Sequence, residues 1–202
     1  NFRADRKMTD PVEWAGFVLS LAMVYCNIRQ IHWGWLLAIV SSALYGFVFW
    51  KSQLFGQAAL QLMFIAMAAW GWRQWLQGRS QTQVPTDMQA SGLPAVSSLQ
   101  RHEWLRVCMA TLLAWVVCTV VLHQLSDSKV LVLDALITAL ALLGQYLLGR
   151  KKIETWWIWL AVNILTIALM VTQDLWLTAF LYFVFAVLSV VGLNTWRKQN
   201  AQ

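Results

Sequence analysis

Charged residues are scarce in this chain of 202 residues. They make up 12% of it, against 59% for hydrophobic residues, and the mean hydropathy is +0.56. So few charges cannot cover the surface of a water-soluble globular protein. The composition therefore predicts an integral membrane protein that contacts the lipid bilayer.

Sequence patterns for catalysis and for cofactor binding are missing as well. The chain has no glycine-rich phosphate loop, no cluster with metal-ligand spacing and no nucleophile beside a base. The three cysteines lie inside apolar stretches, so we read them as packing residues. The sequence predicts no enzyme, no cofactor and no metal.

Acidic residues that could relay protons or ions within the membrane are nearly absent too. Those close to an apolar stretch fall near its ends, namely Glu13, Asp134, Glu154 and Asp174. Ionisable residues inside membrane spans normally mark ion pathways. An ion-coupled pump is therefore disfavoured, and downhill movement is the simpler hypothesis.

What the chain does contain is seven apolar stretches, each close to the roughly 20 residues that a membrane helix needs. They cover residues 11–28, 33–50, 54–77, 104–123, 130–149, 155–172 and 175–196. This pattern predicts an all-α protein with seven transmembrane helices.

Basic residues indicate the orientation of these helices. The net charge is +6 and the pI about 9.6, but no helix face is basic, so nucleic-acid binding is not expected. Ten basic residues fall on one side: Arg29, Arg73, Arg79, Arg101, Arg106, Arg150, Lys151, Lys152, Arg197 and Lys198. Five fall on the other: Arg3, Arg6, Lys7, Lys51 and Lys129. The excess predicts a cytoplasmic C-terminus and an outside N-terminus.

The sequence shows no signal-peptide pattern. It starts at Asn1 without a Met, so the possibility of a preceding segment, including a further helix, stays open.

An internal repeat spans most of the chain. With one ungapped offset of 121 positions, Trp35 falls on Trp156 and Trp75 on Trp196. The same register matches further pairs: Tyr25 with Tyr146, Arg29 with Arg150, Phe64 with Phe185, and Gly71 with Gly192. Matches of rare residues held in one register indicate a duplication.

The duplication predicts how the chain is divided. We expect an N-terminal tail (1–10), a three-helix repeat (11–77), a flexible cytoplasmic linker (78–103), a connector helix (104–123) and a second three-helix repeat (130–197). Three spans end on the side opposite to their start, so one connector restores the direction. A 3+1+3 plan with parallel repeats is found in transporters whose substrate site lies between the halves.

The strongest candidate for a substrate site is the stretch at 155–172. Trp156, Trp159 and Asn163 are spaced so that they share one helix face. An amide near mid-span needs a hydrogen-bonding partner. The alternative to a substrate is an interhelical hydrogen bond, which is common in membrane proteins.

Further polar and aromatic residues form stripes that could face this motif. Thr138 and Gln145 lie on one face of the stretch at 130–149. The other candidates are Gln57, Gln61, Tyr45 and Tyr182. Such a lining suits a neutral or singly cationic aromatic ring that carries amide and hydroxyl groups. For the remaining tryptophans we expect an interfacial belt of Trp14, Trp33, Trp50, Trp70, Trp72 and Trp75.

The pattern Trp156-x-x-Trp159-x-x-x-Asn163 resembles the signature of the PnuC nicotinamide riboside transporters. The resemblance extends to Glu13-Trp14, Gly16, Tyr45, Phe49, Leu54, Gly71-Trp72-x-x-Trp75, Asp134-Ala135-x-x-Thr138, Gln145, Arg150-Lys151-x-x-Glu154 and Gly192-x-x-x-Trp196. It implies a SWEET-like fold, often trimeric, in the bacterial inner membrane. It also implies facilitated diffusion of nicotinamide riboside, which a separate cytoplasmic kinase then traps by phosphorylation.

Two alternatives to this function stay open. Relatives in the wider family are thought to carry thiamine or other vitamins, so another vitamin or a nucleoside is the second hypothesis. A non-transporting membrane scaffold is the third, and the polar residues at matched positions of the two repeats speak against it.

Overall fold

The computed structural model describes residues 11–51, 55–80, 96–125, 131–172, 174 and 176–200. In this part of the chain, seven helices follow one another: α1 (Pro11–Ile28), α2 (Trp33–Lys51), α3 (Phe55–Ser80), α4 (Arg101–Leu125), α5 (Leu131–Gly149), α6 (Thr155–Thr172) and α7 (Trp176–Asn200). Each apolar stretch predicted from the sequence overlaps one of them, and α2, α3, α4 and α7 extend beyond the predicted bounds. The predicted tail at 1–10 and residues 81–95 of the predicted linker lie outside the described residues.

Four of these helices are long and apolar enough to cross a membrane. The qualifying stretches are Arg101–Val121, Val132–Gly149, Thr155–Thr172 and Thr178–Asn200. Shorter apolar stretches belong to α1 and α2, at Val18–Ile28 and Trp33–Phe47. The all-α membrane class expected from the composition is confirmed.

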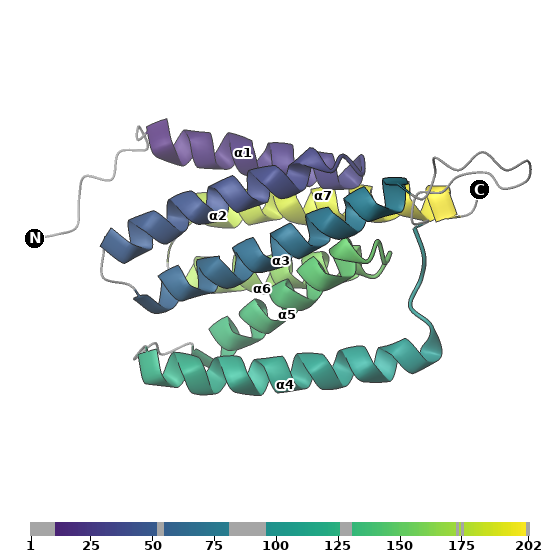
Figure 1. Cartoon of the computed structure of the whole chain (residues 1–202). Coiled ribbons are helices and arrows are strands. Elements are labelled where there is room, and N and C mark those ends of the chain that lie inside the picture. Colours follow the sequence, from purple (N-terminus) through teal and green to yellow (C-terminus); the bar gives the residue numbers. More distant parts are fainter. Residues whose placement is uncertain are drawn as a thin grey trace, which may run out of the picture.

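Each helix runs in the direction opposite to the one before it (Figure 1). α1, α2 and α3 form one group of neighbours and α5, α6 and α7 another, while α3 also contacts α5 and α1 contacts α7. α4 packs on α5 at the edge of the bundle, and most of its side chains are exposed, among them Leu105, Met109 and Leu113. An apolar surface of this kind suits lipid. Because α4 crosses back, α5 starts at the same end of the bundle as α1.

The turns after α1 and after α5 have the same backbone conformation. Gln30 and Lys151, which are 121 positions apart (151 − 30), both have positive φ, 56° and 51°. The next residue in each turn donates its N–H to the carbonyl five positions earlier. Ile31 donates to Cys26, and Lys152 donates to Leu147. This is the Schellman pattern of helix termination. The repeat in the sequence therefore appears as a repeat of local structure.

A tryptophan of the second helix is fitted over a glycine of the third helix in the first repeat. Trp35 of α2 lies so close to Gly71 of α3 that a Cβ there would be 2.4 Å from the indole. Trp75 of α3 meets the Trp35 ring edge-on, with ring centroids 5.5 Å apart. An offset of 121 carries this group onto Trp156, Gly192 and Trp196. Their geometry is nearly the same: 2.5 Å at the glycine and 5.4 Å between centroids.

The last tryptophan of each group also bonds across to the other half. Trp75 Nε1 donates to the Leu148 carbonyl at the end of α5, and Trp196 Nε1 donates to the Ile28 carbonyl at the end of α1, both at 3.2 Å. The expected place of Trp75 in an interfacial belt is wrong, because its side chain is 2% exposed. The Lys151 ammonium lies 4.9 Å from the centroid of the Trp75 ring. The indole is thus enclosed by two halves of the protein.

The end of the predicted linker is attached to the turn between α5 and α6. Ser97 pairs with Lys152 in a short parallel bridge: its N–H donates to the Lys151 carbonyl at 3.2 Å, and its carbonyl accepts the Ile153 N–H at 3.0 Å. The Leu99 N–H donates to Glu154 Oε1 at 2.9 Å. The linker was expected to be flexible as far as residue 103, but its last residues are fixed by these bonds.

Helix α4 begins at Arg101, ahead of the predicted position 104. The Gln100 N–H donates to Glu103 Oε2 at 2.9 Å, and the same oxygen lies 3.0 Å from Lys152 Nζ. A glutamate three residues into a helix that binds back to the cap residue stabilises the first turn. Hydrophobicity, by which the span was predicted, does not report such a polar cap.

We predict that Gly192→Ala lowers the melting temperature of the detergent-purified protein. Alanine favours a helix by about 1 kcal/mol over glycine, but its Cβ would be 2.5 Å from Trp156, which is itself held by Trp196. Overpacking of this kind costs about 1–3 kcal/mol. Thermal unfolding followed by tryptophan fluorescence measures the effect. Val190→Ala, on the exposed side of α7, is the matched control, and adding Trp156→Phe should recover part of the loss. An unchanged or raised melting temperature for Gly192→Ala would show that Trp156 does not pack tightly against Gly192.

We further predict that Glu154→Ala speeds amide exchange at residues 97–99 by roughly fivefold to tenfold, because the Leu99 N–H loses its acceptor. Hydrogen–deuterium exchange with peptide mass spectrometry reads this directly. Glu103→Ala is the control, since it removes the Lys152 ion pair and the α4 cap but leaves the Leu99 bond. Equal protection in the parent and in Glu154→Ala would show that the carboxylate does not hold the segment.

Candidate functional site

Asn163 lies in the middle of α6 and is enclosed between α6 and α7. It is the ninth of 18 helix residues (163 − 155 + 1), and its side chain is 4% exposed. Its Nδ2 donates to Ser189 Oγ of α7 at 3.2 Å, and the Ser189 hydroxyl donates to the Phe185 carbonyl at 2.8 Å. The interhelical hydrogen bond, the alternative weighed from the sequence, is thus present in this conformation.

The two tryptophans of the motif have different surroundings. Trp156 is 3% exposed and is covered by Gly192 and Trp196, so no open ring face is left for stacking. Its indole N–H is buried and has no acceptor among the described residues. Trp159 is half-buried, and its indole edge lies against Gly144 of α5, where a Cβ would be 3.1 Å from Cε2. Trp159 is therefore the ring of the pair that keeps accessible surface.

Helix α5 supplies polar groups next to this motif. Thr138 and Gln145 are half-buried. The fully buried Thr155 donates from Oγ1 to the Gly144 carbonyl at 2.8 Å, which fixes the start of α6 against α5. These contacts set the position of Trp159 relative to the polar stripe of α5.

Two predicted site residues of the first repeat are less buried than Asn163 and Trp156. Gln61 is half-buried and packs against Gly46, while Tyr45 is 46% exposed. Tyr182 of α7 meets Phe185 of the same helix edge-on, with ring centroids 5.9 Å apart. The side chain of Gln57, another predicted site residue, lies outside the described residues.

Three residues on one face of α7 divide the interior into layers. Trp196, Ser189 and Tyr182 follow at intervals of seven residues, or about 10 Å along a helix. Trp156 joins the first layer, Asn163 joins the second, and Phe185 lies beside Tyr182 in the third. The middle layer thus holds neutral hydrogen-bonding groups between two aromatic layers.

An amide and a hydroxyl do not ionise at neutral pH, so what the middle layer offers a ligand is hydrogen-bond donors and acceptors. Among the described residues, no group of three His, Cys, Asp or Glu side chains could bind a metal ion. Ser189 was not among the residues predicted from the sequence. Its spacing from Gly192 and Trp196, three and seven positions, places it on the same face and could have identified it.

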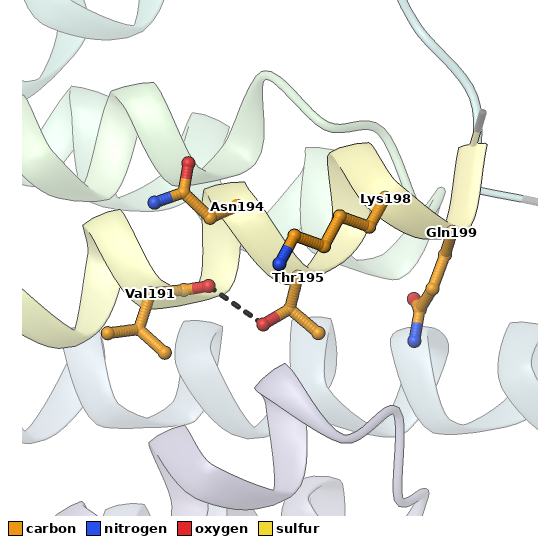
Figure 2. Close-up of a pocket in the computed structure, with 5 residues that line it drawn as sticks. All are labelled: Val191, Asn194, Thr195, Lys198 and Gln199. Carbon is orange, nitrogen blue, oxygen red and sulfur yellow. Dashed lines mark hydrogen bonds between the residues drawn. The ribbon is translucent and has the colours of Figure 1, made fainter.

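A separate hollow lies at the C-terminal end of α7 (Figure 2). It has a volume of about 440 Å³ and is lined by Val191, Asn194, Thr195, Lys198 and Gln199. Its polar groups are already engaged in part: Thr195 Oγ1 donates to the Val191 carbonyl, and Gln199 accepts from Gln30. None of the residues predicted to bind substrate lines it.

Comparison with known proteins adds to this geometry. The family model described as "Nicotinamide mononucleotide transporter" matches residues 10–198. The chain is 22% identical to the nicotinamide riboside transporter PnuC of Escherichia coli (strain K12), covering 92% of this chain and 85% of that protein. It is 24% identical to the riboflavin/roseoflavin transporter RibM of Streptomyces davaonensis, covering 91% and 83%.

A solved structure has the same fold. The crystal structure of the vitamin B3 transporter PnuC superimposes with a TM-score of 0.70 at 22% sequence identity, covering 95% of this chain and 84% of that one.

Proposed function

This chain belongs to the family of nicotinamide mononucleotide transporters, and on that premise we propose that it carries nicotinamide riboside across a bacterial inner membrane. The observation that supports this substrate best is the amide and hydroxyl pair of Asn163 and Ser189, enclosed at mid-span beside the half-buried Trp159. An amide can both accept from and donate to a carboxamide. The indole face of Trp159 can stabilise the pyridinium cation by about 1–2 kcal/mol once it is desolvated.

The charges of the surrounding helices favour a riboside over the phosphorylated mononucleotide. α5 and α6 contain no Lys, Arg or His, and the basic residues of α7, Arg197 and Lys198, lie in its last turn. A buried phosphate normally needs Arg or Lys partners. The middle layer offers neutral groups, which suit a substrate without a phosphate.

The proposed mode of transport is facilitated diffusion. The enclosed polar groups are uncharged, so nothing in them couples substrate movement to protons or sodium ions. A cytoplasmic kinase would trap the product by adding a phosphate that the neutral layer cannot accommodate. We place the C-terminus in the cytoplasm because of the basic residues on that side, and we expect a homotrimer from the family resemblance.

Riboflavin is the second candidate substrate, because a relative of similar identity is named as a riboflavin/roseoflavin transporter. Its ring system is also aromatic and carries hydrogen-bonding carbonyl groups. A binding competition among nicotinamide riboside, riboflavin and thiamine separates these substrates.

We predict that Asn163→Leu weakens the binding of nicotinamide riboside by at least about tenfold, because a carboxamide would then be desolvated without a partner. Isothermal titration calorimetry on the detergent-purified protein measures the dissociation constant. Asn194→Leu, at an exposed asparagine of α7 in the separate hollow, is the matched control and should leave the affinity unchanged. If Asn194→Leu weakened binding and Asn163→Leu did not, the site would lie at the end of α7 instead.

In sealed proteoliposomes we expect labelled riboside to equilibrate down its gradient without ATP, and a protonophore to leave the initial rate unchanged. Vesicles carrying the mononucleotide as the only cargo should show flux close to that of protein-free vesicles. A rate that collapses with the protonophore would contradict facilitated diffusion, while cargo-independent leakage would bring the scaffold hypothesis forward.

A further inference from the structure

We propose that Ser189 is a positioning residue that fixes the direction of the Asn163 amide, and that this direction selects a carboxamide over a carboxylate. The inference rests on the proposed function, since it concerns how the same site tells nicotinamide riboside from its acid analogue, nicotinic acid riboside. It follows from the order of donors and acceptors in the hydrogen-bonded chain of Asn163, Ser189 and Phe185.

The Ser189 hydroxyl has a single hydrogen, and that hydrogen is used within α7. Ser189 Oγ donates to the Phe185 carbonyl at 2.8 Å. As long as that bond is kept, the hydroxyl can only accept toward α6. Asn163 meets this requirement by turning Nδ2 toward Ser189, at 3.2 Å.

The reversed amide is unfavourable for the same reason. With Oδ1 turned toward Ser189, the hydroxyl would either keep its bond to Phe185 and leave two oxygen atoms facing each other, or turn its hydrogen to Oδ1 and give up the Phe185 bond. Either way the pair would make one hydrogen bond fewer. Asn163 is 4% exposed and Ser189 is 3% exposed, so water cannot readily replace the missing bond. An unsatisfied polar contact in such surroundings is costly. Ser189 therefore holds Oδ1 away from α7.

This orientation decides what the Asn163 side chain offers to a ligand. Oδ1 is kept as an acceptor, and one of the two Nδ2 hydrogens remains as a donor. A carboxamide has an N–H for the first and a carbonyl for the second. A carboxylate has no hydrogen to give, so one of its oxygens would oppose Oδ1.

The other repeat shows that helix packing does not require this pair. With the offset of 121, Asn163 corresponds to Ser42 (163 − 121) and Ser189 to Ala68 (189 − 121). Ala68 is 1% exposed, and α2 and α3 pack against each other without an amide and hydroxyl pair at these positions. The close packing of a tryptophan against a glycine, by contrast, occurs in both repeats, as Trp35 on Gly71 and Trp156 on Gly192. The amide and hydroxyl pair is present at these positions in the second repeat and missing from the first. This difference fits recognition of an asymmetric substrate.

Calorimetric titration of the full-length protein in detergent tests the inference, with nicotinamide riboside and nicotinic acid riboside as the two ligands. The parent should prefer the carboxamide. In Ser189→Ala the amide is free to turn its Nδ2 toward a carboxylate, so the ratio of the two dissociation constants should fall by about tenfold, as expected for one misdirected hydrogen bond. Ser189→Thr, which keeps a hydroxyl on the same helix, should preserve the ratio.

Thr166→Val is the matched control for loss of a buried hydroxyl. Thr166 Oγ1 donates to the Val162 carbonyl of its own helix and does not orient Asn163, so this variant should keep the parental ratio. Melting temperature and elution volume show that each variant is folded. If Ser189→Ala weakens both ligands equally, Ser189 is merely structural and the inference is overturned. A parent that binds the riboside without preferring it to the acid overturns the inference alone, whereas a parent that binds neither overturns the proposed function with it.

Discussion

A tryptophan ring fills the space above a glycine in each half of the bundle, and the positions of the other helices depend on these two contacts. Where a Cβ would come within 2.4 or 2.5 Å of an indole, only glycine lets the second and third helices of a repeat approach. In a membrane, where lipid is as apolar as leucine, close packing of this kind replaces the hydrophobic effect as the force between helices. The edge-on neighbours Trp75 and Trp196 are then placed by the contact itself.

The same contact connects the halves. Because each of these neighbours is fixed against a tryptophan of its own repeat, its N–H points to the last carbonyls of the first helix of the other repeat. Helix ends leave such carbonyls without partners inside the helix. The Trp196 bond gives the Ile28 carbonyl a partner, and the Trp75 bond adds a second donor to the Leu148 carbonyl, which also accepts the Lys151 N–H. The two bonds tie α7 to α1 and α3 to α5, so similar bonds join the repeats at this end. The enclosed polar layer begins beyond this end.

The proposed function depends on the absence of charge in the middle layer of the bundle. In that proposal, a cationic ring is desolvated against aromatic faces and an amide without a buried counter-ion, because Asn163 and Ser189 carry no charge. Weak, neutral recognition suits a carrier that must release its cargo on the other side. The repeats differ at this position, where the second has Asn163 and the first has Ser42. On the proposed function, this difference gives the pseudo-symmetric scaffold a direction in which an asymmetric ring can bind.

The sequence by itself determined the class, the seven helices and the duplication, because hydrophobicity, charge and repeat register are properties of the chain alone. It also placed Asn163 at mid-span and grouped it with Trp156 and Trp159 on one face. Only the tertiary structure decided which partners these residues meet, since that depends on the neighbouring helix. Trp156 faces Gly192 and is covered, Trp159 stays half-buried, and Trp75 leaves the expected interfacial belt because Trp35 and Leu148 enclose it. Ser97 and Glu154 likewise fix residues that composition alone would leave as a flexible linker, because backbone hydrogen bonds between distant segments carry no signature in either segment.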